Sequence, residues 1–185
     1  MGFAEKHLQS LGSSNLMDDC FHHQTDALQA AARADKSARN IGSLLSRVKY
    51  ADGTLGKKFE GNAQNLAALL REWLAIVTEK GAARRWVKPE DIAIAPITFR
   101  RVANASLAHF LDGKCVQCHG TGVAESKRAC IPCKGSGKIE LTGLSGYEAK
   151  LVLDMVSELG AIESTHAAIA STLLRKHDLA AEEIA

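Results

Sequence analysis

Four cysteines in the second half of the chain form two pairs with matching surroundings. The pairs stand in Cys115-Val-Gln-Cys118-His-Gly-Thr-Gly122 and Cys130-Ile-Pro-Cys133-Lys-Gly-Ser-Gly137, and both segments have the pattern C-x-x-C-x-G-x-G. Each pair places two thiolates on one tight turn, and two such turns supply the four ligands of a closed tetrahedral zinc site. The glycines permit the positive φ that turns backbone N–H groups toward the sulfurs. The spacing predicts one structural Zn²⁺ ion, bound by Cys115, Cys118, Cys130 and Cys133.

Other roles for these residues remain open. The pairs could be redox disulfides or free thiols, but a redox C-x-x-C usually begins a helix that follows a strand, and neither pair is preceded by such a sequence. His119 could replace one cysteine as a ligand, although four thiolates already fill the site. Because a filled site has no open position for water, a catalytic zinc is not expected and the chain is predicted not to be an enzyme.

Composition favours a helical protein in a reducing compartment. The chain has 185 residues, a formal net charge of +2, few aromatic residues and abundant alanine, which favours helices over sheet. No apolar run approaches the length of a bilayer span, and the segment from Met1 to Lys6 has no signal-peptide features. We therefore expect a cytoplasmic location without a membrane partner, where cysteine pairs are better explained by metal than by disulfides. Cys20 is expected to pack as a small hydrophobic residue.

Apolar spacing predicts an all-α fold, a helical bundle with an inserted zinc-binding module of four cysteines. Helices are expected at 25–49, 62–80, 98–111, 145–159, 162–177 and 179–184, with Gly81, Gly113 and Gly160 as stops. A capping box of Ser145 and Glu148 marks the start of one of them. The expected organisation is a weakly ordered segment 1–24, a helical domain 25–113, a zinc module 114–138, and C-terminal helices 139–185 that pack on the helical domain.

Basic residues gather in two places that could meet phosphates or an acidic protein face. The candidate nucleic-acid contacts are Arg84, Arg85, Lys88, Arg100 and Arg101 before the cysteines, and Lys127, Arg128, Lys134 and Lys138 among them. Lys114 adds a further cation, and Glu125 is the single acid between Lys114 and Lys138. An ordinary solvated surface would give the same pattern.

The helices expected on either side of Gly160 could form a helix-turn-helix. The second helix would present side chains suited to base edges and phosphates, namely Ser164, Thr165, His166 and Arg175. An antiparallel helical hairpin without DNA-binding function has the same sequence pattern.

The cysteine motif resembles those of two known families. The C-x-x-C-x-G-x-G pattern is similar to half of the cysteine-rich domain of DnaJ chaperones, which carry four copies and two zinc ions, but His-Pro-Asp does not occur in this chain. The run Cys118-His-Gly-Thr-Gly122, together with Cys133-Lys-Gly135, looks like the Q family of late-gene antitermination proteins of lambda-like phages. The stretch from Lys49-Tyr50 to Glu60-Gly61-Asn62, before a leucine-rich helix, and the helical tail look similar too.

The resemblance to the Q family covers about the last two-thirds of the chain, and two features depart from the family pattern. The loop between the cysteine pairs is shorter, and the region from Arg84 to Leu111 is extra sequence. The resemblance implies a factor that binds double-stranded DNA at a phage late promoter in the bacterial host. It further implies loading onto paused RNA polymerase that retains its sigma factor, and readthrough of terminators. The alternatives are a zinc-stabilised interaction adaptor of DnaJ type, a zinc-containing DNA-binding regulator of initiation, and a thiol oxidoreductase.

Overall fold

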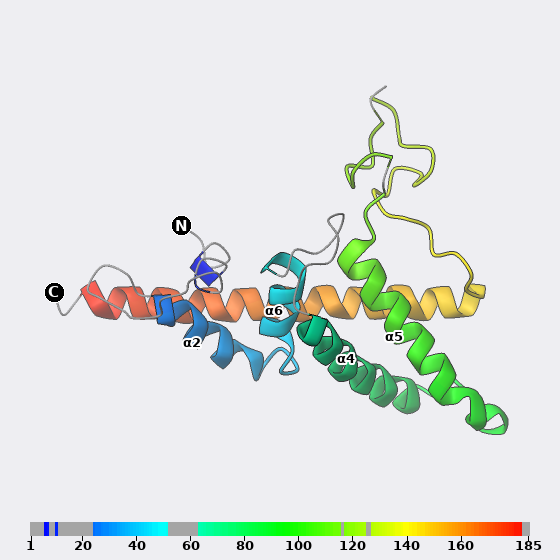
Figure 1. Cartoon of the computed structure of the whole chain (residues 1–185), viewed down its shortest axis with the longest axis horizontal. Coiled ribbons are helices and arrows are strands. Elements are labelled where there is room, and N and C mark those ends of the chain that lie inside the picture. Colours follow the sequence, from blue (N-terminus) through cyan, green and yellow to red (C-terminus); the bar gives the residue numbers. More distant parts are fainter. Residues whose placement is uncertain are drawn as a thin grey trace. The chain divides into compact units, whose positions relative to one another are not determined.

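The computed structural model describes residues 6, 7, 10, 24–51, 63–115, 117–124 and 127–182 (Figure 1). Cys20, Glu125, nearly all of the expected segment 1–24 and the stretch 52–62 lie outside these residues. Gly53, Lys58 and Glu60, which contribute to the resemblance, are therefore not described either.

The described chain is helical, as the sequence predicts. Its elements are α2 (Gln24–Asp35), α3 (Gly42–Ser46), a π-helical turn η1 (Arg47–Ala51), α4 (Ala63–Ala83), a 3-10 turn η2 (Pro89–Ile94), α5 (Ala95–Asp112) and α6 (Gly146–Glu182). Within the described residues there is no strand, and extended pairing is limited to the antiparallel bridges Lys114–Lys138 and Val123–Ala129. The fold is all-α with an inserted cysteine module.

The chain forms two compact units. One unit comprises Met1–Leu69 and Gly160–Ala185, and the other comprises Leu70–Leu159 and includes the cysteines. The division passes through α4 and α6. It does not test the domain boundaries expected at residues 24, 113 and 138, which stay predictions.

The core of the Leu70–Leu159 unit is formed by the apolar stripes that the sequence predicts. Its fully buried side chains include Trp73 and Val77 of α4, Val102 of α5, and Val152, Met155 and Leu159 of α6. The buried indole of Trp73 donates a hydrogen bond from Nε1 to Ser106 Oγ at 3.0 Å, so its polar atom is satisfied within the core. This packing holds the helices on both sides of the cysteine module.

Gly81 does not end α4, which corrects the expectation for this residue. The helix continues to Ala83, and Gly81 is buried against two aromatic rings. A Cβ at this position would lie 2.5 Å from Phe99 Cε1 and 2.9 Å from Trp86 Cε3. These two rings pack edge to face, with centroids 6.1 Å apart. The glycine is therefore explained by close packing of α4 on the aromatic pair.

The helix expected at 25–49 is interrupted, which is a second correction. Arg39 and Asn40 have φ values of 57° and 60°, and such left-handed residues cannot continue an α-helix. The Asn40 N–H donates to the Asp35 carbonyl at 2.8 Å, and the Asp35 carboxylate accepts from the Ser43 N–H at 2.7 Å. Asp35 thus ends α2 and satisfies a free donor at the start of α3.

Gly160 does not end a helix, so the helix-turn-helix interpretation is wrong. The capping box is confirmed, since the Glu148 N–H donates to Ser145 Oγ at 3.2 Å and the Ser145 N–H donates to Glu148 Oε2 at 3.1 Å. From there α6 is continuous from Gly146 to Glu182 (Figure 1). The buried positions continue at helical spacing through the glycine, at Val152, Met155, Leu159, Ile162, His166 and Ala170. This periodicity outweighs the helix penalty of a single glycine.

Replacing Gly160 with alanine should stabilise the protein. A Cβ at Gly160 would have no atom within 4 Å, and alanine in a helix interior is favoured over glycine by about 0.5–1 kcal/mol. Thermal unfolding monitored by circular dichroism measures the change. A lower melting temperature for Gly160→Ala would indicate a turn at this position and would contradict a continuous α6.

Candidate metal centre

The four cysteines converge on one buried point. Their Sγ atoms all lie within 4.8 Å of one another, and all four side chains are buried. The Cys115 and Cys130 sulfurs are 3.9 Å apart, and the Cys118 and Cys133 sulfurs are 3.7 Å apart. Four sulfurs at about 2.3 Å from a tetrahedral Zn²⁺ are separated by about 3.8 Å. The arrangement therefore fits a metal ion at its centre, and all four thiols are free.

Each cysteine pair lies in a knuckle, and the two knuckles (residues 115–122 and 130–137) have the same backbone hydrogen bonds. The Gly120 N–H donates to the Cys115 carbonyl at 3.2 Å, and the Gly135 N–H donates to the Cys130 carbonyl at 3.1 Å. The glycines of both motifs have positive φ, at 88° and 76° in the first knuckle and 84° and 72° in the second. The prediction that the glycines adopt this conformation is confirmed.

A hydroxyl residue supports each knuckle, and the sequence analysis did not identify this role. Thr121 Oγ1 donates to the Cys118 carbonyl, and Ser136 Oγ donates to the Cys133 carbonyl, both at 2.7 Å. The two residues occupy the same place between the paired glycines. The signal was present in the sequence, because the last x of both C-x-x-C-x-G-x-G motifs is a hydroxyl residue.

The knuckles interlock through reciprocal backbone contacts. The Cys115 N–H donates to the Gly137 carbonyl, and the Cys130 N–H donates to the Gly122 carbonyl, both at 2.8 Å. A Cβ on Gly122 would clash with the Gly135 carbonyl oxygen, and a Cβ on Gly137 would clash with the Gly120 carbonyl oxygen. The last glycine of each motif is thus required both for its φ and for the approach of the other knuckle.

The electrostatics of the cluster favour a bound cation. For Cys118, burial raises the pKa, but hydrogen bonds, first from the Gly122 N–H, lower it to about 6. For Cys130, burial and the neighbouring thiols raise the pKa to about 12. Thiolates this close repel one another, so all four can be ionised together only around a positive ion. Such an ion would be fully coordinated, with no open position for a substrate.

His119 lies outside this ligand set. Its side chain is exposed and its backbone has a φ of 50°. The cluster of possible ligand atoms is formed by the four cysteines. The alternative in which His119 replaces a cysteine is therefore not supported by the geometry.

Four of the nine candidate nucleic-acid contacts are engaged in ion pairs. Arg84 pairs with Asp154 at 2.7 Å, Lys88 with Glu90 at 3.5 Å, Arg101 with Glu148 at 3.1 Å, and Lys134 with Glu140 at 2.6 Å. Within the described part of the chain no ion pair involves the other five, which are all exposed: Arg85, Arg100, Lys127, Arg128 and Lys138. The available positive charge is thus smaller than the sequence predicts.

Of the four tail residues proposed for base contacts, Ser164, Thr165 and Arg175 are exposed, whereas His166 is not accessible to DNA. His166 is fully buried, and its Nε2 lies 3.1 Å from the Ala31 carbonyl oxygen. Ser164 Oγ donates to the Gly160 carbonyl at 2.8 Å. A buried histidine that contacts α2 cannot reach a base edge, so its role is in packing.

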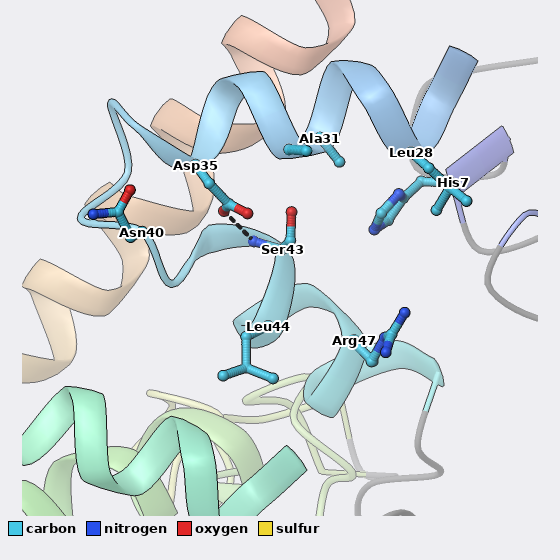
Figure 2. A pocket seen from close by; sticks show the side chains of 9 residues that line it. His7, Leu28, Ala31, Asp35, Asn40, Ser43, Leu44 and Arg47 are labelled. Atoms are coloured by element: carbon cyan, nitrogen blue, oxygen red, sulfur yellow. Dashed lines mark hydrogen bonds between the residues drawn. The ribbon is translucent and has the colours of Figure 1, made fainter. Parts of the chain in front are cut away.

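A pocket of about 310 Å³ lies in the unit that contains α2 and α3 (Figure 2). Its polar lining comprises His7, Asp35, Asn40, Ser43 and Arg47. His166, which is not a lining residue, has its Nε2 3.2 Å from Ser43 Oγ and 3.6 Å from Asp35 Oδ1. A catalytic Ser-His-Asp relay needs the hydroxyl and the carboxylate on different ring nitrogens. Both groups approach the same nitrogen here, so these residues do not form such a relay.

Comparison with known proteins leaves the family open. No family model, no curated protein and no solved structure matches this chain. Among the described helices, none is long and apolar enough to cross a membrane. The four-cysteine cluster is therefore the feature of this chain that bears most directly on its function.

Proposed function

We propose that this chain is a non-enzymatic transcription antitermination factor of the phage Q type, in which one Zn²⁺ ion orders a cationic module. The observation that carries the proposal is the set of four buried thiols, spaced for one tetrahedral ion, in two knuckles whose basic side chains are exposed. The resemblance of these knuckles to those of the Q family supplies the role in transcription. The site of action is the cytoplasm of the bacterial host.

Zinc is the proposed ion because of the donor set. A tetrahedral site of four thiolates is typical of zinc or of iron bound by sulfur. Structural zinc sites contribute on the order of 10 kcal/mol to the folding of small modules. Such a contribution is important for this segment, because its β-type backbone pairing within the described residues consists of two isolated bridges. Metal analysis of the purified protein distinguishes zinc from iron.

The module is the proposed contact with double-stranded DNA. Lys127 and Arg128 lie between the knuckles, and Lys114 and Lys138 form the bridge at their base; all four are exposed. Lysine and arginine held on a rigid loop can bind phosphates with little loss of conformational entropy. The other proposed partner is bacterial RNA polymerase that retains its sigma factor.

Transcription in a purified bacterial system tests the function. The template carries the late promoter of the phage or prophage that encodes this chain, followed by a terminator. We expect terminator readthrough that requires both the protein and the promoter-proximal DNA. A change in initiation without readthrough would support a zinc-containing regulator of initiation. No effect on transcription, together with suppression of client aggregation, would support the DnaJ-type adaptor.

Reversing the charge of Lys127 and Arg128 should weaken DNA binding. The double variant Lys127→Glu/Arg128→Glu should lower the affinity for promoter DNA about tenfold and reduce the dependence of log K on log salt by about 2. Fluorescence anisotropy across a salt series measures both. Arg71→Glu is the matched control, because Arg71 is an exposed cation on α4. Unchanged affinity in the double variant would place the DNA contact elsewhere.

A further inference from the structure

An apolar groove lies within the Leu70–Leu159 unit, away from the cysteines in the sequence. It has a volume of about 490 Å³ and is formed by the second half of α4, the connector that includes η2, and the first turns of α5. Its apolar lining includes Leu74, Ala82, Val87, Ile92, Pro96 and Phe99. None of these residues takes part in the metal centre.

Three exposed isoleucines lie in the chain segment that forms part of the groove. Ile92, which lines it, is 72% exposed, and Ile94 and Ile97 are 51% and 62% exposed. Single exposed apolar residues are common, but three within six positions, one of which lines the groove, concentrate exposed apolar surface in this segment. Together with the apolar lining of the groove, Ile92 offers apolar surface that another molecule can cover.

The cations that line this groove differ in their ion pairing from the cations next to them in the sequence. Arg85 and Arg100 both line it, and neither has an ion-pair partner within the described residues. The adjacent cations Arg84 and Arg101 are paired, with Asp154 and Glu148. Among the described residues no carboxylate lines the groove. The groove thus combines an apolar floor with two guanidinium groups that are available to a ligand.

We propose that this groove binds a segment of a partner protein that presents apolar side chains flanked by carboxylates, in the form of an amphipathic acidic helix. Apolar side chains would fill the groove, as in helix-in-groove recognition. The carboxylates would pair with Arg85 and Arg100, whose guanidinium groups bind carboxylates in bidentate geometry.

Charge and polarity favour this occupant over two others. Nucleic-acid interfaces are polar and strongly basic, whereas the floor of this groove is apolar. A second copy of the chain would bring the same arginines toward each other, because a two-fold interface pairs identical patches. An acidic helix instead complements both the floor and the rim. This proposal does not rest on the function proposed for the zinc module.

Binding of designed peptides to the full-length, metal-loaded protein tests the proposal. The probe is a fluorescein-labelled helical peptide with leucine at i, i+3, i+4 and i+7 and glutamate at the flanking positions. One comparison peptide has lysine for every glutamate, and another has serine for every leucine. We expect the Leu/Glu peptide to bind at least about tenfold more tightly than either comparison peptide. It should shift the amide resonances of Ala82, Val87, Ile92 and Phe99.

Variants identify the contacts. Arg85→Glu/Arg100→Glu should weaken the Leu/Glu peptide about tenfold or more and should favour the lysine peptide. Ile92→Ser should weaken the Leu/Glu peptide without unfolding the protein, because Ile92 is largely exposed. The matched control is Lys150→Glu, an exposed cation of α6 that does not line the groove.

Several results would overturn the proposal. They are failure of the Leu/Glu peptide to bind, equal binding of the lysine peptide, binding that the arginine variants do not change, and displacement of the peptide by duplex DNA. Concentration-dependent shifts of the groove resonances without peptide would also overturn it, in favour of self-association.

Discussion

The variant Cys130→Ser should lose its metal and unfold the segment 114–138, while the helices remain folded. Cys130 is fully buried among the other three sulfurs, and a serine hydroxyl cannot replace a thiolate ligand of a soft metal site. Without the ion, the module loses a contribution on the order of 10 kcal/mol. The rest of its pairing, within the described residues, is turns and two isolated bridges, which cannot compensate for that loss.

The helical core should be largely unaffected by this loss. Trp73, Val102 and Met155 are packed in a core contributed by α4, α5 and α6, and no cysteine of the module belongs to it. We therefore expect a helical circular-dichroism spectrum close to that of the parent protein. Amide resonances of residues 117–124 and 127–138 should collapse into the unfolded range.

Metal analysis and NMR check this prediction. Elemental analysis should give one zinc per chain for the parent protein and much less for Cys130→Ser, and Cys118→Ser should behave in the same way. Cys20→Ser and His119→Ala are controls that should keep the metal, since Cys20 belongs to neither C-x-x-C motif and His119 lies outside the four-cysteine cluster. Full metal content in Cys130→Ser, or metal loss in His119→Ala, would show that the ligand set is wrong.

The metal site could be predicted from sequence because its information is local. A C-x-x-C turn fixes two ligands within four residues, and the repeated glycines report the φ values that the turn needs. The same local information predicted the capping box at Ser145 and Glu148, which the structure confirms. The helix stripes were equally accessible, because helical periodicity depends on neighbours three and four positions away.

The roles of individual glycines were less predictable, because they depend on distant partners. Gly81 and Gly160 both looked like helix stops, yet α4 and α6 continue through them. At Gly81 the reason is the aromatic pair of Trp86 and Phe99, which no pattern around residue 81 reveals. At Gly160 the apolar periodicity continues on both sides and overrides local propensity.

The basic clusters were also misleading from sequence alone. Arg84, Arg101 and Lys134 find carboxylates 70, 47 and 6 residues along the chain, and sequence proximity indicates only the last of these. Counting cations therefore overestimated the charge available for phosphates. Within the described residues Arg85 and Arg100 have no ion-pair partner, and only the tertiary structure reveals that both lie beside an apolar groove.

Replacing Gly122 with alanine should weaken metal binding far more than replacing Gly143. Both residues have a φ of 76°, so alanine incurs the left-handed backbone cost of about 1–2 kcal/mol at each. At Gly143 a Cβ would have no atom within 4 Å, whereas at Gly122 it would clash with the Gly135 carbonyl oxygen. That oxygen belongs to the backbone of the other knuckle, so relief of the clash must separate the two cysteine pairs.

The comparison of these two variants isolates the interlock from backbone strain. We expect the zinc affinity of Gly122→Ala, measured by competition with a chromogenic chelator, to fall at least about tenfold below that of Gly143→Ala. Gly137→Ala should match Gly122→Ala, since a Cβ there would clash with the Gly120 carbonyl oxygen in the reciprocal contact. Equal affinities for Gly122→Ala and Gly143→Ala would mean that the knuckles hold the ion without close contact. The paired C-x-x-C turns would then suffice, and the last glycine of each motif would serve only its own turn.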